Sequence, residues 1–244
     1  PAVTHAEIVR AFRNAGAHVL FEKPITTTSH EAQALIALAR ETGKVLTVGH
    51  QERFVFARTG LLDLVETPLE ITCWRQGPWT GRGDDVSAVL DLMIHDLDLV
   101  HTLVPGAVAD VQATGLAEYG PLADEVSATV TFASGTVARL ETSRIADVRQ
   151  RGMRAVYADG MIEIDFLART VTNTTPRPLG ALEMGDPLGE SVGGFVRAAR
   201  GLAPALVTAE QAAQALETAL LIEDAAGVGI AAPVPVFAKR AAAG

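Results

Sequence analysis

The spacing of apolar residues changes near residue 67, and this change limits the folds open to the chain. Before it, two short apolar runs alternate with three helical segments, at 4–15, 18–22, 30–42, 45–49 and 53–66. Uninterrupted apolar strands separated by helices are typical of a parallel sheet covered by helices. We therefore predict that residues 1–67 form the C-terminal portion of a Rossmann-type α/β domain.

After residue 67 the apolar residues alternate, as they do in half-buried antiparallel strands. Strands are expected at 69–75 and 170–173, with hairpins that turn at 133–135 and 159–160. Helices are expected at 86–104, 187–200 and 208–226. Residues 68–244 are thus predicted to form an α+β domain, whose mostly antiparallel open sheet is packed by helices, with the last helices packing back toward the first domain.

The composition excludes several classes of protein. The chain has 244 residues, 48% of them hydrophobic, which is enough for a sizeable core. A net charge of −9 argues against a nucleic-acid partner, and no apolar run is long enough to span a membrane. The single cysteine, Cys73, lies in an expected strand, which favours a packed thiol in a reducing compartment. We expect a cytoplasmic protein.

Polar groups follow both apolar strands of the first part. Glu22-Lys23-Pro24 follows one strand, and Gly49-His50-Gln51 follows the other. In an open parallel sheet, ligands bind outside the carboxyl ends of the strands. The ammonium of Lys23 could then bond ribose or substrate hydroxyls, and Pro24, in trans or cis, would fix the turn. The alternative is that Glu22 and Lys23 form an ordinary ion pair in a loop.

The long helix at 86–104 carries a polar stripe. At 100° per residue, Asp91 and His95 share one face at spacing i,i+4, close enough to hydrogen-bond. A carboxylate beside an imidazole suits a general base, although a solvated polar face is an alternative. Metal binding would need a third ligand, and none is obvious. Asp96 falls among apolar residues, so we expect it to be structural, paired with an arginine or with backbone amides.

The end of the strand at 69–75 and the loop that follows it combine arginines with aromatic rings. Trp74 and Arg75 end the strand, and Trp79 and Arg82 lie in the loop. This combination suits a phosphorylated or nucleotide-bearing ligand, and Arg82, between two glycines, is the better candidate of the two arginines. The alternative is a flexible crossover loop with ordinary surface charge.

These residues together resemble the Gfo/Idh/MocA family of NAD(P)-dependent oxidoreductases. The matching elements are His5, Glu22-Lys23-Pro24, Gly49-His50-Gln51 with Arg53-Phe54, and Asp91-xxx-His95. The order of these elements matches the family over nearly the whole chain. Two further segments, RGDDVSAVLDLMIHDLDLV and EMGDPLGESVGGFVRAARG, resemble a branch of the family that oxidises C3 of UDP-N-acetylglucosamine in the synthesis of amide-linked lipid A.

The resemblance implies roles for particular residues. The catalytic residues would be Lys23, Asp91 and His95, with His95 taking a proton as hydride leaves for NAD⁺ or NADP⁺. The nicotinamide end would contact His5, Glu22, Lys23, Pro24 and Gln51. The sugar nucleotide would contact Arg53, Arg82, Asp91 and His95, and no metal would take part.

The resemblance also implies partners. Family members form homodimers or homotetramers through the open face of the antiparallel sheet. In the UDP-sugar branch, a PLP-dependent aminotransferase acts on the keto product. Two alternatives stay open: a dehydrogenase of another sugar or polyol, of the inositol or glucose type, and a non-catalytic ligand-binding or dimerisation fragment.

One departure from the family pattern concerns the cofactor. The family's GxGxxG unit, with the acidic residue that holds the adenosine ribose, is absent from this sequence. We expect that two strand–helix units, roughly 60–70 residues, precede this segment in the native protein. This segment should then bind NAD poorly and be inactive by itself, and the residue that selects NAD over NADP would lie in the missing portion.

Overall fold

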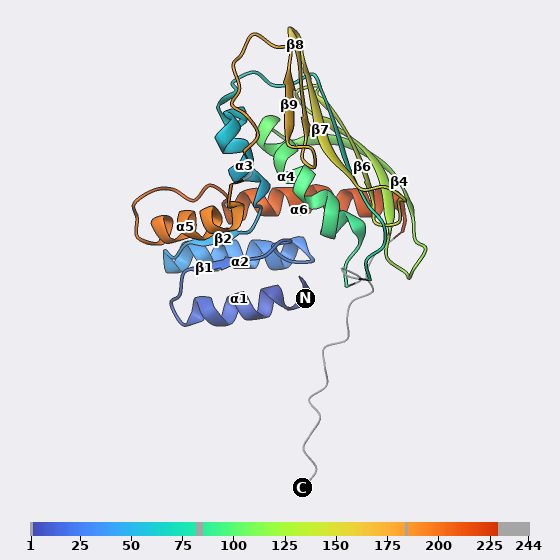
Figure 1. Cartoon of the computed structure of the whole chain (residues 1–244). Coiled ribbons are helices and arrows are strands. Elements are labelled where there is room, and N and C mark those ends of the chain that lie inside the picture. The colour runs from blue at the N-terminus through green and yellow to red at the C-terminus, as the bar shows by residue number, and fades with distance from the viewer. Residues whose placement is uncertain (1, 82–84, 184, 229–244) are drawn as a thin grey trace.

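The computed structural model describes residues 2–81, 85–183 and 185–228, and it contains two sheets with helices packed between and around them (Figure 1). One sheet has two parallel strands and the other has seven strands. The predicted fold class is therefore confirmed: a small Rossmann-type parallel part is followed by a mostly antiparallel sheet with helices. Among the described residues, no helix is both long and apolar enough to cross a membrane.

The parallel part is built from local signals that the sequence carries. Its strands are β1 (Val19–Phe21) and β2 (Leu46–Val48), and its helices are α1 (His5–Asn14), α2 (Ser29–Thr42) and α3 (Glu52–Thr59). The Thr28 side chain caps α2 by accepting a hydrogen bond from the amide of Glu31. Helix α3 ends earlier than predicted because Gly60 adopts a positive φ of 80°, which starts a short 3₁₀ turn.

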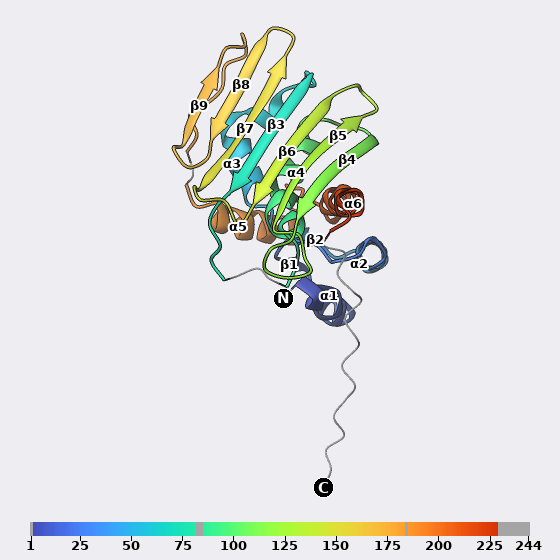
Figure 2. The same cartoon turned by 90° about the vertical axis from the view of Figure 1, so that its right-hand side faces the viewer.

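The seven strands of the larger sheet run in the order β4-β5-β6-β3-β7-β8-β9 (Figure 2). Their bounds are β3 (Glu70–Gln76), β4 (Val108–Leu116), β5 (Glu125–Phe132), β6 (Val137–Ser143), β7 (Gln150–Tyr157), β8 (Gly160–Asp165) and β9 (Thr170–Asn173). All neighbouring pairs are antiparallel except β3 and β6, which are parallel. Strand β3 is central, so its inward side chains, Cys73 among them, are buried.

Three further helices pack against the sheets and against the helices of the parallel part. Helix α4 (Ile94–Leu103) lies against the inner face of the larger sheet, and helix α6 (Ala209–Ala226) packs against β4, α4 and α2 (Figure 1). Helix α5 (Pro187–Ala199) packs against α3. The predicted pairing of Thr208 with Gln211 is confirmed as a capping box at the start of α6. The last two helices therefore contact elements of the parallel part.

Candidate active site

The turn after β1 and the turn after β2 lie side by side at the carboxyl edge of the parallel sheet. The amide of Gly49 donates to the carbonyl of Phe21 at 2.8 Å, which extends the ladder to the strand ends. The Lys23–Pro24 peptide bond is cis, and Nδ1 of His5 lies 2.8 Å from the Pro24 carbonyl oxygen. His5 thus anchors the turn that carries Lys23.

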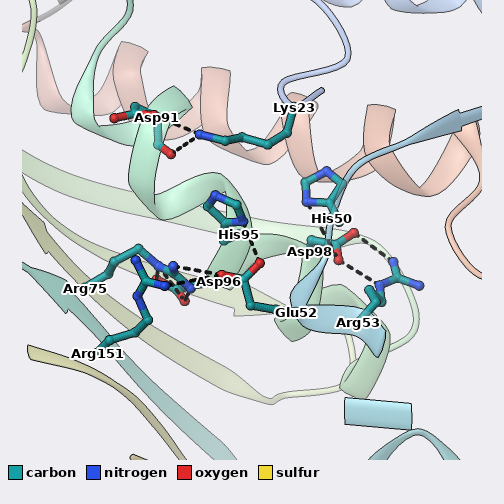
Figure 3. Close-up of polar contacts among 10 residues, drawn as sticks. All are labelled: Lys23, His50, Glu52, Arg53, Arg75, Asp91, His95, Asp96, Asp98 and Arg151. Atoms are coloured by element: carbon teal, nitrogen blue, oxygen red, sulfur yellow. Dashed lines mark hydrogen bonds and ion pairs between the residues drawn. The ribbon is translucent and has the colours of Figure 1, made fainter. Parts of the chain in front are cut away.

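The ammonium of Lys23 reaches across to the long helix of the second part (Figure 3). Its Nζ lies 2.8 Å from Oδ1 of Asp91 and 2.6 Å from the main-chain oxygen of Asp91. An ammonium has three N–H donors, and Asp91 accepts from two of them. One donor of Lys23 therefore remains available to a ligand.

The predicted hydrogen bond between Asp91 and His95 is wrong. Asp91 lies in a π-helical turn (Val89–Met93) that precedes α4 and was predicted to be ordinary α-helix. A π-turn closes i to i+5 bonds, so each residue advances by less than the 100° of an α-helix. Asp91 and His95 consequently leave their common stripe, and each takes a partner from a different element.

The partner of His95 is Glu52, the first residue of α3, which our sequence reasoning missed. Nδ1 of His95 lies 2.8 Å from Oε2 of Glu52 (Figure 3). Burial alone would raise the pKa of Glu52, but the imidazole of His95 and the guanidinium of Arg75 outweigh it and hold this pKa well below its usual range. Glu52 is thus an ionised carboxylate that occupies one ring nitrogen of His95 and leaves Nε2 for a substrate proton.

Glu52 also joins this site to the larger sheet. Its Oε1 accepts from Nη1 of Arg75 at 3.1 Å and lies 3.8 Å from Nη1 of Arg151. Arg75 bonds both carboxylate oxygens of Asp96, with a shortest distance of 2.7 Å. The prediction that Asp96 is structural and pairs with an arginine is confirmed. Arg75 is consequently buried and engaged on both sides.

Arg53 is held in a second buried pair. Its Nε and Nη2 donate to the two carboxylate oxygens of Asp98 at 2.7 and 2.8 Å. We predicted a substrate contact for Arg53, but its side chain is 3% exposed and lies behind the crevice. The geometry gives that prediction no support, and we assign Arg53 to the scaffold that connects α3 to α4.

His50 lies between His95 and the Arg53–Asp98 pair. Its ring is 1% exposed and stands edge-on to His95, with a centroid distance of 6.1 Å (Figure 3). Burial lowers the pKa of His50 to about 4, even though Nδ1 lies 3.9 Å from Oδ2 of Asp98. His50 is therefore neutral near pH 7 and packs as an aromatic wall behind His95.

A cavity of about 290 Å³ opens beside these groups. Its lining includes Glu22, Gly49 and Gln51 from the strand ends, together with Glu52, Val55, His95, Arg151, Phe166 and Pro187. The structure thus places the predicted residues Glu22, Gln51 and His95 around one space. Arg151 had no signal in the sequence, because it arrives from β7, a hundred residues after α3.

Two further sequence predictions concern Arg82 and metals. Arg82, predicted to bind the substrate, lies outside the described residues. Within the part of the chain that the structure describes, no three histidine, cysteine or acidic side chains are grouped as metal ligands.

Comparison with known families defines the class of protein. Residues 1–50 match the model of an oxidoreductase family with an NAD-binding Rossmann fold, and residues 64–163 match the model of the GFO/IDH/MocA C-terminal domain. The chain belongs to the Gfo/Idh/MocA oxidoreductase family, as its sequence motifs predicted.

Individual relatives agree with this assignment. UDP-N-acetylglucosamine 3-dehydrogenase of Acidithiobacillus ferrooxidans is 37% identical over 172 residues, a match that covers 70% of this chain and 55% of that protein. A solved structure of this enzyme, GnnA, superimposes with a TM-score of 0.87 at 33% identity and covers 92% of this chain and 75% of that one. The 1,5-anhydro-D-fructose reductase of Ensifer adhaerens is 26% identical over 94% of this chain and 76% of its own. The chain thus spans little more than half of the first of these relatives.

Proposed function

We propose that this chain carries the substrate-binding and catalytic part of an NAD(P)-dependent dehydrogenase that oxidises the C3 hydroxyl of UDP-N-acetylglucosamine. The observation that carries the proposal is a set of two partly exposed pairs: His95 held by Glu52, which both line the 290 Å³ cavity, and Lys23 held by Asp91, on the turn that also carries the lining residue Glu22. The similarity to the Acidithiobacillus dehydrogenase supports the choice of substrate.

The residues present fit the nicotinamide end of a dinucleotide. The 290 Å³ cavity lies at the carboxyl ends of β1 and β2, where such cofactors bind in doubly wound sheets. Gly49 keeps this edge open, since a Cβ there would stand 3.3 Å from both carboxylate oxygens of Glu22. Lys23 and the amide of Gln51 would hold the ribose and carboxamide, with His5 and Pro24 fixing the turn. Both NAD and NADP satisfy this fit.

Oxidation of a secondary alcohol removes a proton from the oxygen and a hydride from the carbon. The bound cofactor supplies the hydride acceptor. The protein's task is the proton: Nε2 of His95 takes it from the hydroxyl, while Glu52 stabilises the imidazolium that forms. The free N–H of Lys23 donates to the same oxygen and stabilises the developing alkoxide. Asp91 is the positioning residue for Lys23.

A substrate panel tests this proposal. Formation of NADH or NADPH by the native protein, with every segment that its gene encodes, would be followed with UDP-N-acetylglucosamine, UDP-glucose, free N-acetylglucosamine and myo-inositol, first with NAD⁺ and then with NADP⁺. We expect the highest kcat/KM with UDP-N-acetylglucosamine, and loss of its turnover in Lys23→Met. A higher kcat/KM with myo-inositol or with a free sugar would transfer the assignment to a polyol or sugar dehydrogenase, and binding without turnover would favour a ligand-binding fragment.

We also propose that the outer face of the larger sheet forms a homodimer or homotetramer interface. No helix of the described residues covers that face (Figure 2). Trp74 lies on it, packed over Gly152, where an added Cβ would clash with the indole. Light scattering of the wild type and Trp74→Glu would test it, with dissociation expected in the variant.

We further propose that the 3-keto product of the reaction is passed to a PLP-dependent aminotransferase in the cytoplasm.

A further inference from the structure

A second cavity, of about 330 Å³, adjoins the site on the side away from the parallel strands. Asp91 and Arg151 both line it, and Arg151 lines the first cavity as well. The remaining walls come from the ends of β3 and β6, the loop at 77–80 and the start of β7. The two cavities are therefore neighbours that share one arginine.

Four arginines line this second cavity, and two of them are already neutralised. Arg75 bonds Asp96 and Glu52. Arg144 donates to Oδ1 of Asp124 at 2.6 Å and to the carbonyl of Val86 at 3.0 Å. Both side chains are buried, and their donors are directed into the protein rather than toward a ligand.

The other two arginines keep donors for a ligand. Arg151 makes a 3.8 Å ion pair with Glu52, and Arg149 is exposed, with no ion pair or hydrogen bond within the described part of the chain. Arg151 stands directly opposite Arg75 in the β3–β7 ladder, where like charges repel. Burial, and then the nearby charge of Arg75, lowers the pKa of Arg151.

The acidic groups on this wall do not cancel these charges. Asp91 is engaged by Lys23, and Asp147 forms no ion pair with an arginine within the described part of the chain, so four arginines face two aspartates on this lining. In a chain of net charge −9, this wall therefore concentrates positive charge in one concave place. A polyanion bound here would relieve the repulsion among the arginines.

The cavity also has a fixed aromatic wall. The guanidinium of Arg144 lies 5.0 Å from the centre of the Trp79 ring, and the Tyr119 ring stacks on Trp79 with a centroid distance of 4.9 Å. These contacts hold the loop at 77–80 in place. The site is thus formed before a ligand arrives, which reduces the entropy cost of binding.

We propose that Arg149 and Arg151 bind the diphosphate of a nucleoside-diphosphate sugar. Because Arg151 lines both cavities, a diphosphate held there lets the attached sugar enter the first cavity beside His95. This inference rests on the proposed function and narrows it, since inositol and free sugars lack the diphosphate. The arginine pair therefore gives the site its preference for sugar nucleotides.

Calorimetric titration with UDP, inorganic pyrophosphate and NAD⁺ tests this inference without requiring turnover. We expect Arg149→Gln and Arg151→Lys to weaken the binding of UDP and pyrophosphate by about 10- to 100-fold, the loss expected for charge-assisted hydrogen bonds to phosphate. Any affinity for NAD⁺ should not depend on these two arginines, because we place the nicotinamide end in the other cavity, at the carboxyl ends of β1 and β2. UDP binding should also weaken as salt is added.

Arg154→Gln is the matched control. Arg154 lies on the same strand as Arg151 but on the outer face, where it pairs with Glu163. The UDP affinity of Arg154→Gln should equal that of the wild type. Equal UDP affinity in Arg149→Gln and the wild type, or no UDP binding by the wild type, would overturn the inference. If UDP binding depends on these arginines but no UDP-sugar is oxidised, the diphosphate subsite would stand and the proposed reaction would be wrong.

Discussion

Two layers of ion pairs meet around His95, and they differ in exposure. In the inner layer, Arg53–Asp98 and Arg75–Asp96 have side chains that are at most 3% exposed. In the outer layer, Lys23 and Asp91 are 17% and 31% exposed, and His95 and Glu52 are 16% and 14% exposed. The pairs join α3, strand β3 or the turn after β1 to the helical segment that carries Asp91, His95, Asp96 and Asp98.

This difference in exposure distinguishes the pairs that stabilise the fold from the pairs that can act on a substrate. In the inner layer, each carboxylate accepts two or more bonds from one guanidinium, so the charges compensate each other. In the outer layer, Lys23 keeps one N–H and His95 keeps Nε2. Only groups with an unused donor or acceptor at a cavity can transfer or polarise a substrate proton. The outer layer should therefore control turnover, and the inner layer should control stability.

The largest expected effect on stability follows from breaking an inner pair. Asp96→Asn leaves the buried charge of Arg75 with Glu52 as its remaining ion-pair partner, and should lower the free energy of unfolding by about 3–5 kcal/mol. Asp91→Asn, in the outer layer, should change it by no more than about 1 kcal/mol because solvent screens that pair. Urea denaturation of both variants measures the contrast, and equal losses would remove the distinction between the layers.

Glu223 shows what happens to a buried carboxyl that has no cation partner among the described residues. It hydrogen-bonds the hydroxyl of Ser87, and burial raises its pKa from 4.5 to about 7. A raised pKa means that the folded state binds the proton more tightly. Proton binding by Glu223 therefore contributes to the free energy of unfolding. This contribution is complete below about pH 4.5, and as the pH rises toward 7 the free energy of unfolding loses about 3 kcal/mol.

Glu223→Gln, which stays neutral, should remove this loss. Unfolding free energies measured between pH 4.5 and 8 for the wild type and the variant would test it. His50 and His101, whose pKa values burial lowers to about 4, act in the opposite sense, since their contribution is lost as the pH falls below 6.5. The two histidines are present in both proteins. The difference between the two curves of unfolding free energy against pH therefore reports the contribution of Glu223 alone. A difference that does not change with pH would contradict the prediction.

Glu52 belongs to both layers, and its replacement should affect both properties. Glu52→Gln removes the charge beside His95, so we expect kcat to fall by about 10- to 100-fold with little change in KM. Stability should fall by about 1–2 kcal/mol through the lost bond to Arg75. Steady-state kinetics with Glu52→Asp as the conservative comparison would show partial recovery of kcat. A rise in KM at constant kcat would instead assign Glu52 to substrate binding.

The smallest expected effect is at the strand end. Gly49→Ala places a Cβ 3.3 Å from the Glu22 carboxylate, which is exposed and can move away. We expect a loss of stability below about 1 kcal/mol and a rise in the KM for the cofactor of a few-fold. A loss of several kcal/mol would show that Gly49 serves the fold rather than the cavity.

Features that depend on local sequence patterns could be predicted, whereas the partners of the site residues could not. The parallel strands, the hairpins and the α6 capping box depend on local patterns, and they were predicted correctly. The partner of Asp96 could be expected because a buried carboxylate needs a compensating group. The partners of Asp91 and His95 could not be predicted, because the π-turn at Val89–Met93 changes the register of the helix and leaves no clear signal in composition.

Arg53 and Arg151 show a second reason why the site could not be fully predicted from the sequence. Arg53 lies next to Glu52 in sequence, yet one faces the inner layer and the other the outer layer, and this depends on how α3 packs against α4. Arg151 enters both cavities because β7 pairs with β3, which is a contact between distant segments. Its role could be recognised only once the sheet order was known.

The kcat of His95→Asn at saturating substrate tests the central claim most directly, with unfolding measured on the same sample and His30→Asn, an exposed histidine, as control. We expect kcat to fall by about 10²- to 10⁴-fold, the range for loss of a general base, while the unfolding free energy stays within about 1 kcal/mol of the wild type. A kcat within twofold of the wild type would show that the outer layer does not carry the chemistry.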